Sequence, residues 1–160
     1  MPELQPLRVD HGPAVLAFEL ANRGYFTEFI SDRGDEFFDR FAERQDASLA
    51  EQEAGINAYY LLVDDDGSVL GRFNLYGIKD GAAEVGYRVA QRVAGRGVAT
   101  AAVRELCRLA AERHGLRTLK AAVNHENVAS QKVLIKVGFH PVGPAEPGGR
   151  AGSWYQLDLA

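Results

Sequence analysis

The stretch that decides the fold is Arg92-Val93-Ala94-Gly95-Arg96-Gly97. Before it, residues 82–90 place apolar side chains at every second position, which predicts a strand. After it, residues 98–114 place apolar side chains at the spacing of one helical face, and Gly115 is suited to end that helix. Residues 116–123 predict another strand. The six residues therefore form the loop of a strand-loop-helix-strand unit.

This loop is suited to hold a phosphate group. Its glycines allow backbone N–H groups to approach an anion closely, and the helix that follows adds the positive end of its dipole. A nucleotide-binding P-loop requires a Gly-Lys-Ser or Gly-Lys-Thr run, which this sequence lacks. The dinucleotide fingerprint requires a glycine where Thr100 stands and an acidic residue about 20 positions further on, and residues 116–123 contain none. Neither nucleotide motif therefore explains the loop.

The loop resembles motif A of the GNAT superfamily of acetyl-CoA-dependent N-acetyltransferases, in which Arg/Gln-x-x-Gly-x-Gly/Ala wraps the coenzyme A pyrophosphate. Arg92, Gly95 and Gly97 match this pattern. A later segment, Asn127-Val128-Ala129-Ser130 closed by Val137-Gly138-Phe139, resembles the ribosomal-protein N-acetyltransferase (Rim-like) branch. The two segments lie about 35 residues apart, each on the element expected for it. The resemblance implies the GNAT fold and acetyl transfer.

The remaining elements follow the order of that fold. The sequence predicts strands at residues 4–9, 58–63, 68–78, 82–90, 116–123, 139–142 and 152–159, and helices at 10–22, about 35–55, 98–114 and 127–137. Asp10 is the candidate N-cap of the first helix. We therefore expect one α/β (α+β) domain over residues 1–160, with a mixed, mostly antiparallel sheet, a central splayed parallel strand pair and about four helices.

Composition limits the function classes. The chain has 160 residues, enough to bury a core, and its 46% hydrophobic and 25% charged content is typical of a soluble globular protein. No signal peptide or membrane-spanning run is present, so we expect a cytoplasmic protein with no membrane partner. A net charge of −4 argues against a nucleic-acid partner. The single Cys107 and the four scattered histidines predict no metal site.

Charge is distributed unevenly along the chain. Basic residues predominate in residues 88–120, and acidic residues predominate in residues 26–53, which also hold several phenylalanines. The first region suits an anionic cofactor and the second a cationic partner, although each is also what a solvated helix face would show.

The resemblance also implies which residues hold coenzyme A. The pyrophosphate would lie against the whole loop, Arg92, Val93, Ala94, Gly95, Arg96, Gly97 and Val98. The pantetheine arm would pair with the backbone of Tyr87 and Val89, either of which could also donate an N–H to the thioester oxygen. Asn127 would hold the coenzyme arm, and it is also suited to cap the helix.

The same resemblance suggests how protons move. Ser130 would give or relay a proton to the departing sulfur. Many family members use a tyrosine four residues beyond that serine, but this chain has Leu134 there, so the acid is Ser130, a water or no group at all. Glu84 is the candidate base for the amine, against the alternative of an exposed strand charge. Asn74 and Tyr155 either line the acceptor pocket or are satisfied polar groups of the core.

These patterns predict an acyl-CoA-dependent N-acetyltransferase. It would transfer acetyl from acetyl-CoA to a primary amine, either a protein N-terminus or a small molecule, by direct attack in a ternary complex. Two alternatives remain open: a non-catalytic acyl-CoA-binding or sensing module, and a nicotinamide-dinucleotide enzyme. A homodimer is neither indicated nor excluded by the sequence.

Overall fold

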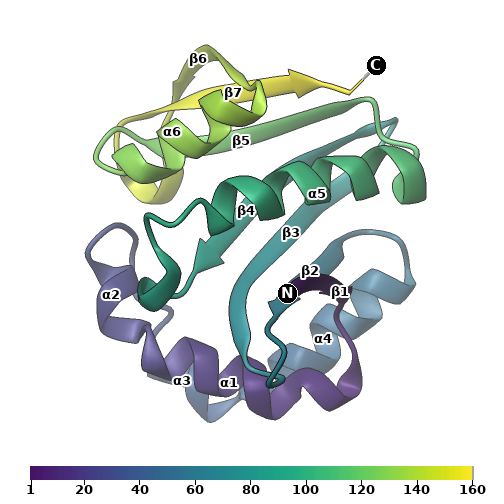
Figure 1. Ribbon diagram of the computed structural model, residues 1–160, viewed down its shortest axis with the longest axis vertical. Helices are drawn as coiled ribbons and strands as arrows, with labels where there is room; N and C mark the ends of the chain where they lie inside the picture. Colours follow the sequence, from purple (N-terminus) through teal and green to yellow (C-terminus); the bar gives the residue numbers. More distant parts are fainter. Residues whose placement is uncertain (160) are drawn as a thin grey trace.

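The computed structural model describes residues 1–159, which are arranged around one seven-stranded sheet (Figure 1). The strands lie in the order β1-β2-β3-β4-β5-β7-β6. Their bounds are β1 (Glu3–Pro6), β2 (Ala58–Val63), β3 (Val69–Lys79), β4 (Ala82–Val89), β5 (Thr118–Asn124), β6 (His140–Ala145) and β7 (Gly152–Asp158). β1 ends at Pro6, earlier than the predicted end at residue 9. β6 ends at Ala145, later than the predicted end at residue 142, and so includes part of the proline-rich segment.

The parallel pair at the centre of the sheet diverges. All other neighbouring strands are antiparallel, whereas β4 and β5 run parallel and pair only through Ala82–Thr118, Ala83–Leu119 and Glu84–Lys120. Beyond Glu84 the two strands no longer pair, although β4 continues to residue 89 and β5 to residue 124. The mixed, mostly antiparallel sheet with a splayed parallel pair is therefore confirmed.

Residues 1–159 contain six α-helices, more than the predicted four or so. They are α1 (Gly12–Ala21), α2 (Arg23–Thr27), α3 (Asp35–Asp39), α4 (Phe41–Glu53), α5 (Val98–His114) and α6 (Val128–Val137), with 3-10 turns η1 (Val9–His11), η2 (Gln91–Val93) and η3 (Pro147–Gly149). The helix predicted near residues 35–55 is divided because Arg40 has non-helical dihedral angles (φ −113°, ψ 29°). This break accompanies an edge-to-face contact of the Phe37 and Phe41 rings, with centroids 5.8 Å apart.

The predicted cap of the first helix was wrong. Asp10 lies inside η1, where its carboxylate accepts a hydrogen bond from Arg8 Nε at 3.1 Å. The N-cap of α1 is His11, and no side chain caps this helix end. The short turn η1 thus separates the strand from the helix, and Asp10 is used within that turn.

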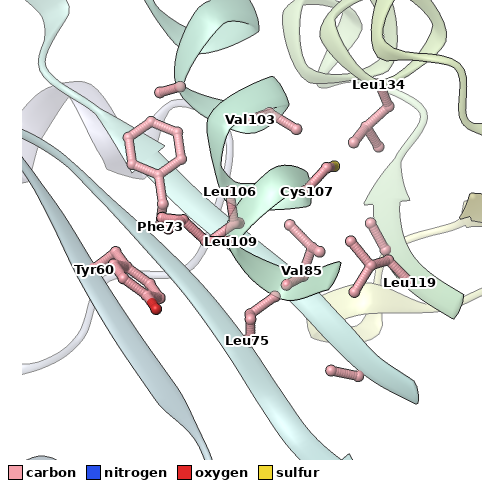
Figure 2. Close-up of a cluster of buried hydrophobic side chains, with 14 of the residues drawn as sticks. Tyr60, Phe73, Leu75, Val85, Val103, Leu106, Cys107, Leu109, Leu119 and Leu134 are labelled. Carbon is pink, nitrogen blue, oxygen red and sulfur yellow. The ribbon is translucent and has the colours of Figure 1, made fainter. Parts of the chain in front are cut away.

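Helices cover both faces of the sheet. Val103, Leu106 and Leu109 of α5 pack with Phe73 and Leu75 of the sheet in the main hydrophobic cluster, which also contains Cys107 (Figure 2). The opposite face packs against α1, α2 and α4. We call these the α5 face and the α1 face.

Strand alternation assigns the polar side chains of β3 and β4 to the α1 face. Side chains of successive strand residues point to opposite faces. Since Phe73, Leu75, Ala83 and Val85 belong to the α5-face cluster, the residues between and beside them point to the α1 face. These residues are Arg72, Asn74, Tyr76, Glu84, Gly86 and Arg88. The charged side chains of Arg72, Glu84 and Arg88 therefore lie on the α1 face of β3 and β4.

Candidate active site

The glycine-bearing loop leads from β4 into α5 and presents unused amide groups. Gly95 and Gly97 have φ angles of 75° and 76°, in the left-handed region that favours glycine. Gly97 is the N-cap of α5, where no side chain caps the helix. Outside the regular helices and strands, no backbone hydrogen bond is donated by residues 95–100. These N–H groups and the positive end of α5 are suited to bind an anion.

The edge of β4 also presents N–H groups to the gap between the strands. Ala90 N–H donates to Leu70 O at 2.8 Å, which directs it toward β3. Backbone groups of alternate strand residues point to opposite edges. The N–H groups of Tyr87 and Val89 therefore point toward the gap that opens where β5 diverges. This is the backbone geometry that the sequence suggests for these two residues.

A cavity of about 320 Å³ extends from the loop to this gap. It is bounded by the loop and the first turn of α5, by the end of β4, by one face of α6 and by aromatic side chains of α2 and the residues after it. Of the predicted cofactor residues, the lining includes Tyr87, Val89, Val93, Ala94, Gly95, Gly97 and Asn127. We call it the loop cavity.

The predicted arginines do not line the loop cavity. Arg92 and Arg96 are exposed, and Arg92 Nη2 donates to Ser68 Oγ at 3.0 Å; Val98 is also absent from the lining. The cationic lining groups include Lys132 and Lys136 of α6, which our sequence analysis missed. They share a helical face with Ala129 and Val133, a spacing that could have indicated them.

Two hydroxyl groups meet at the gap. Tyr87 OH and Ser130 Oγ lie 2.8 Å apart, one from β4 and the other from the first turn of α6. The Tyr87 ring is stacked on Phe73, with ring centroids 5.6 Å apart and planes 7° apart. Burial raises the pKa of Tyr87 to about 12, although the Ser130 hydrogen bond opposes this rise. Tyr87 therefore remains protonated at neutral pH.

Asn127 fixes the position of Ser130. Its side-chain Oδ1 accepts a hydrogen bond from Ser130 N at 3.2 Å, which makes Asn127 the N-cap of α6. Leu134, one turn further on, is completely buried in the α5-face cluster. The hydroxyl next to Ser130 thus comes from Tyr87. From the sequence we predicted only a backbone role for Tyr87, because nothing local in the sequence shows this contact.

A second cavity of about 220 Å³ lies between the diverging strands. Its walls include Val85 and Gly86 of β4, residues 121–124 of β5 and Arg150. Ile30, Tyr87, Asn127 and Ser130 line both this gap cavity and the loop cavity. Molecules in the two cavities would therefore meet at the Tyr87 and Ser130 hydroxyls.

One carbonyl ties the N-terminal helices to the far side of the gap. Phe29 O accepts hydrogen bonds from Asn124 Nδ2 at 3.0 Å and from Arg150 Nη1 at 2.8 Å. Asn124 ends β5, and Arg150 precedes β7. The segment after α2 is thereby held over the α1 face of the gap.

The other predicted residues lie apart from these hydroxyls. Glu84 is exposed on the α1 face of β4 and lines neither cavity, but surrounding protein raises the pKa of its carboxyl by desolvation. Tyr155 is buried in the α5-face cluster and lines neither cavity. Asn74 is buried on the α1 face, where it lines a third cavity.

Residues 1–159 show neither a metal-binding cluster nor a membrane-spanning helix. No cluster of three or more histidine, cysteine, aspartate or glutamate side chains is arranged to hold a metal ion. None of the helices has the length and apolar character that crossing a membrane requires.

Known proteins resemble this chain over most of its length. Residues 3–140 match the model of the acetyltransferase (GNAT) domain family. The probable N-acetyltransferase YjcK of Bacillus subtilis (strain 168) is 27% identical over 148 residues, which cover 89% of this chain and 82% of that protein.

Solved structures share the fold. The ribosomal-protein-S5-alanine acetyltransferase of Vibrio fischeri superposes with a TM-score of 0.91 at 19% identity, covering 99% of this chain and 93% of that one. The spermidine N-acetyltransferase of Vibrio cholerae, in complex with CoA and spermine, superposes with a TM-score of 0.80 at 16% identity, covering 99% and 95%. With its family match over most of the chain and a sheet that opens beside a glycine loop, this protein belongs to the GNAT acetyltransferase family.

Proposed function

We propose that this protein transfers the acetyl group of acetyl-CoA to a primary amine by direct attack in a ternary complex. The observation that carries the proposal is the junction of two cavities at Tyr87 and Ser130, inside the gap of the sheet. One cavity begins at an anion-binding loop, and the other opens between the diverging strands. A donor and an acceptor held there would meet at groups able to move a proton.

The lining of the loop cavity suits the pyrophosphate and pantetheine arm of coenzyme A. The amides of residues 95–100 and the start of α5 would bind the pyrophosphate, and Lys132 and Lys136 would add positive charge. The N–H groups of Tyr87 and Val89 would pair with the pantetheine arm, and one of them would stabilise the oxyanion of the thioester carbonyl. Bound acetyl-CoA supplies the activated acyl group.

Ser130 would protonate the departing sulfur, supported by Tyr87. Tyr87 keeps its proton at neutral pH and can donate a hydrogen bond to Ser130 Oγ, which leaves the serine proton free for the thiolate. As Ser130 gives its proton to the sulfur, Tyr87 OH passes its own proton to Ser130 Oγ, and the Tyr87 phenolate then regains a proton from solvent. A water molecule in place of Ser130 is the alternative donor.

Glu84 would take the proton of the amine through a water. It points to the α1 face from the strand whose next α1-face residue, Gly86, lines the gap cavity. A carboxyl with a raised pKa takes up a proton more readily than an ordinary one. Because Glu84 lines neither cavity, direct contact with the amine is not part of the proposal.

The acceptor is a protein N-terminus or a small-molecule amine. The Vibrio fischeri structure is named for ribosomal protein S5 and the Vibrio cholerae structure for spermidine, so the shared fold accommodates both kinds of acceptor. We assign the chain to the Rim-like branch on its Asn127-x-x-Ser130 segment. This assignment favours a peptide N-terminus.

The test measures acetyl-CoA binding by calorimetry and acetyl transfer to panels of peptides and small amines. We expect binding and turnover with at least one acceptor. Ser130→Ala and Glu84→Gln should lose turnover while keeping coenzyme affinity. Binding without turnover on every acceptor would instead identify a non-catalytic acyl-CoA-binding or sensing module.

A further inference from the structure

A third cavity of about 240 Å³ lies on the α1 face, apart from the loop and gap cavities. It is bounded by α3 and α4 on one side and by β2 and β3 on the other, and it is open to solvent. None of its lining residues lines either of the other two cavities. We call it the arginine cavity, because Arg33, Arg44 and Arg72 line it.

Of the residues that the structure describes, those whose buried polar side-chain atoms lack a hydrogen-bond partner all line this cavity. Within residues 1–159, three buried side-chain nitrogen or oxygen atoms lack a hydrogen-bond partner: Gln45 Nε2, Arg72 Nε and Asn74 Oδ1. All three residues line the arginine cavity, and each is at most 8% exposed. Buried polar groups are nearly always paired in folded proteins. A ligand that brings both acceptor and donor atoms to this cavity would pair with them.

The charge around the cavity is positive. Arg72 Nη1 and Arg33 Nε both bind the buried carboxylate of Glu19, at 2.8 Å and 2.9 Å, so two cations share one anion. The acidic lining residue, Glu51, already accepts hydrogen bonds from Asn57 and Tyr59. Arg44 adds a third cation. An anionic group would therefore be favoured inside.

The walls also limit the size and shape of the ligand. Phe37, Phe41, Tyr59 and Tyr76 contribute aromatic surface to the lining, which suits an apolar or flat body. The planar Arg72 guanidinium matches a planar carboxylate, and the unpaired acceptor oxygen of Asn74 would pair with a hydroxyl or N–H donor on the body of the ligand. We propose that the arginine cavity binds a small organic carboxylate with an apolar body.

The arginine cavity lies one strand away from the gap cavity. Tyr76 lines the first and Gly86 the second, and a Cβ atom on Gly86 would lie 2.8 Å from Tyr76 Cε2. The Tyr76 ring thus packs directly on the strand that forms the gap. The carboxylate would belong either to the amine acceptor or to a separate molecule. The first of these alternatives rests on the proposed function.

Calorimetric titration with benzoate and benzamide tests the site without any turnover. The two probes share shape but differ in charge. We expect benzoate to bind saturably and benzamide about tenfold more weakly, the ratio that corresponds to one charge-assisted hydrogen bond. Arg44→Gln should reduce the difference, because it removes one of the three lining cations and leaves Arg33 and Arg72 in place. Arg72→Lys, which keeps the charge beside Glu19, should weaken benzoate binding by removing the planar donor pair.

Arg40→Gln is the matched control. Arg40 lies just before α4, is exposed, bridges Glu36 and Glu43, and does not line the cavity. Benzoate binding should be unchanged in this variant. The proposal is overturned if benzoate and benzamide bind equally, if neither binds, or if Arg40→Gln and Arg44→Gln lose benzoate affinity equally.

Acetyl transfer to 4-(aminomethyl)benzoate and 4-(aminomethyl)benzamide then identifies the source of the carboxylate. The two amines are compared by their kcat/KM values. A preference for the carboxylate that is smaller in Arg44→Gln than in the wild type, and unchanged in Arg40→Gln, places the carboxylate on the acceptor. Equal turnover of both amines, with benzoate binding intact, assigns it to a separate molecule. If neither of these amines nor any acceptor of the peptide and amine panels is acetylated, the proposed function fails, while the benzoate titration still decides the site.

Discussion

Tyr87 OH and Ser130 Oγ, whose residues lie 43 positions apart in the chain, form a 2.8 Å hydrogen bond at the junction of the loop and gap cavities. Tyr87 is held by its stack on Phe73, and Ser130 by the Asn127 cap. Both hydroxyls therefore have defined positions before any ligand binds. Such preorganisation is what a proton donor in the site requires.

Tyr87→Phe should lower kcat about tenfold and leave the Kd of coenzyme A nearly unchanged. The ring and its stack on Phe73 remain, whereas Ser130 loses its partner, so the loss should be smaller than the roughly 10²-fold of a direct general acid. Steady-state kinetics and calorimetry measure the two quantities. Tyr60→Phe is the control, because Tyr60 OH is bonded to His114 Nε2 at 2.8 Å outside both cavities. Equal kcat losses in the two variants would count against the relay.

The raised pKa of Tyr87 predicts a loss of stability at high pH. The folded-state pKa is about 12 and the unfolded value about 10, so the unfolded chain binds fewer protons between these values. The contribution is complete below pH 10 and is lost as the pH rises toward 12, by at most about 2.7 kcal/mol. Urea unfolding from pH 9 to 12 should show a steeper decline for the wild type than for Tyr87→Phe. If the free energy of unfolding declined equally with pH in both proteins, ionisation of Tyr87 would not contribute to the pH dependence of stability.

Lys132→Gln and Lys136→Gln should each weaken coenzyme A binding, by roughly threefold to tenfold, because each removes one positive charge from the loop cavity. Higher salt should reduce these differences. Isothermal titration at two ionic strengths measures both effects. Lys79→Gln, at the exposed end of β3, is the control and should bind as the wild type does. Affinities unchanged in the α6 variants would remove these lysines from the binding site.

Glu19→Gln should lower the free energy of unfolding by about 3–5 kcal/mol, because it leaves buried arginines without their counter-ion. Glu19 is 1% exposed and bridges Arg33, Arg72 and Arg88. Burial alone would raise the pKa of its carboxyl, but Arg33 and Arg72 lower it overall. Its contribution is thus present above the unfolded pKa and is lost as pH falls through the lower folded value. Urea unfolding checks this, with the exposed Glu43→Gln as control.

The sequence predicted the order of the elements because that information is local. Apolar side chains of α5 recur on one face, and Gly115 and Gly138 end α5 and α6, as expected. The break at Arg40 escaped prediction, since residues on both sides of it are helical and it is marked by neither proline nor glycine. The order of helices and strands can thus be predicted from local periodicity, whereas a break inside a helix depends on tertiary packing.

The site could be predicted only where its residues belong to one segment. The loop residues and Asn127-x-x-Ser130 each form a short pattern. The partner of Ser130 is on β4, far away in the sequence, and no periodicity shows such a contact. The same holds for the arginine cavity, where Gln45, Arg72 and Asn74 come from a helix and a strand.

Isothermal titration of coenzyme A into the wild-type protein and into Gly97→Ala tests most directly whether the loop binds a diphosphate. An alanine at φ 76° strains the backbone that presents the amides, and no atom within 4 Å would clash with the new Cβ. We predict one coenzyme A per wild-type chain and clearly weaker binding to the variant. Absence of any binding of coenzyme A or acetyl-CoA to the wild type would contradict the account.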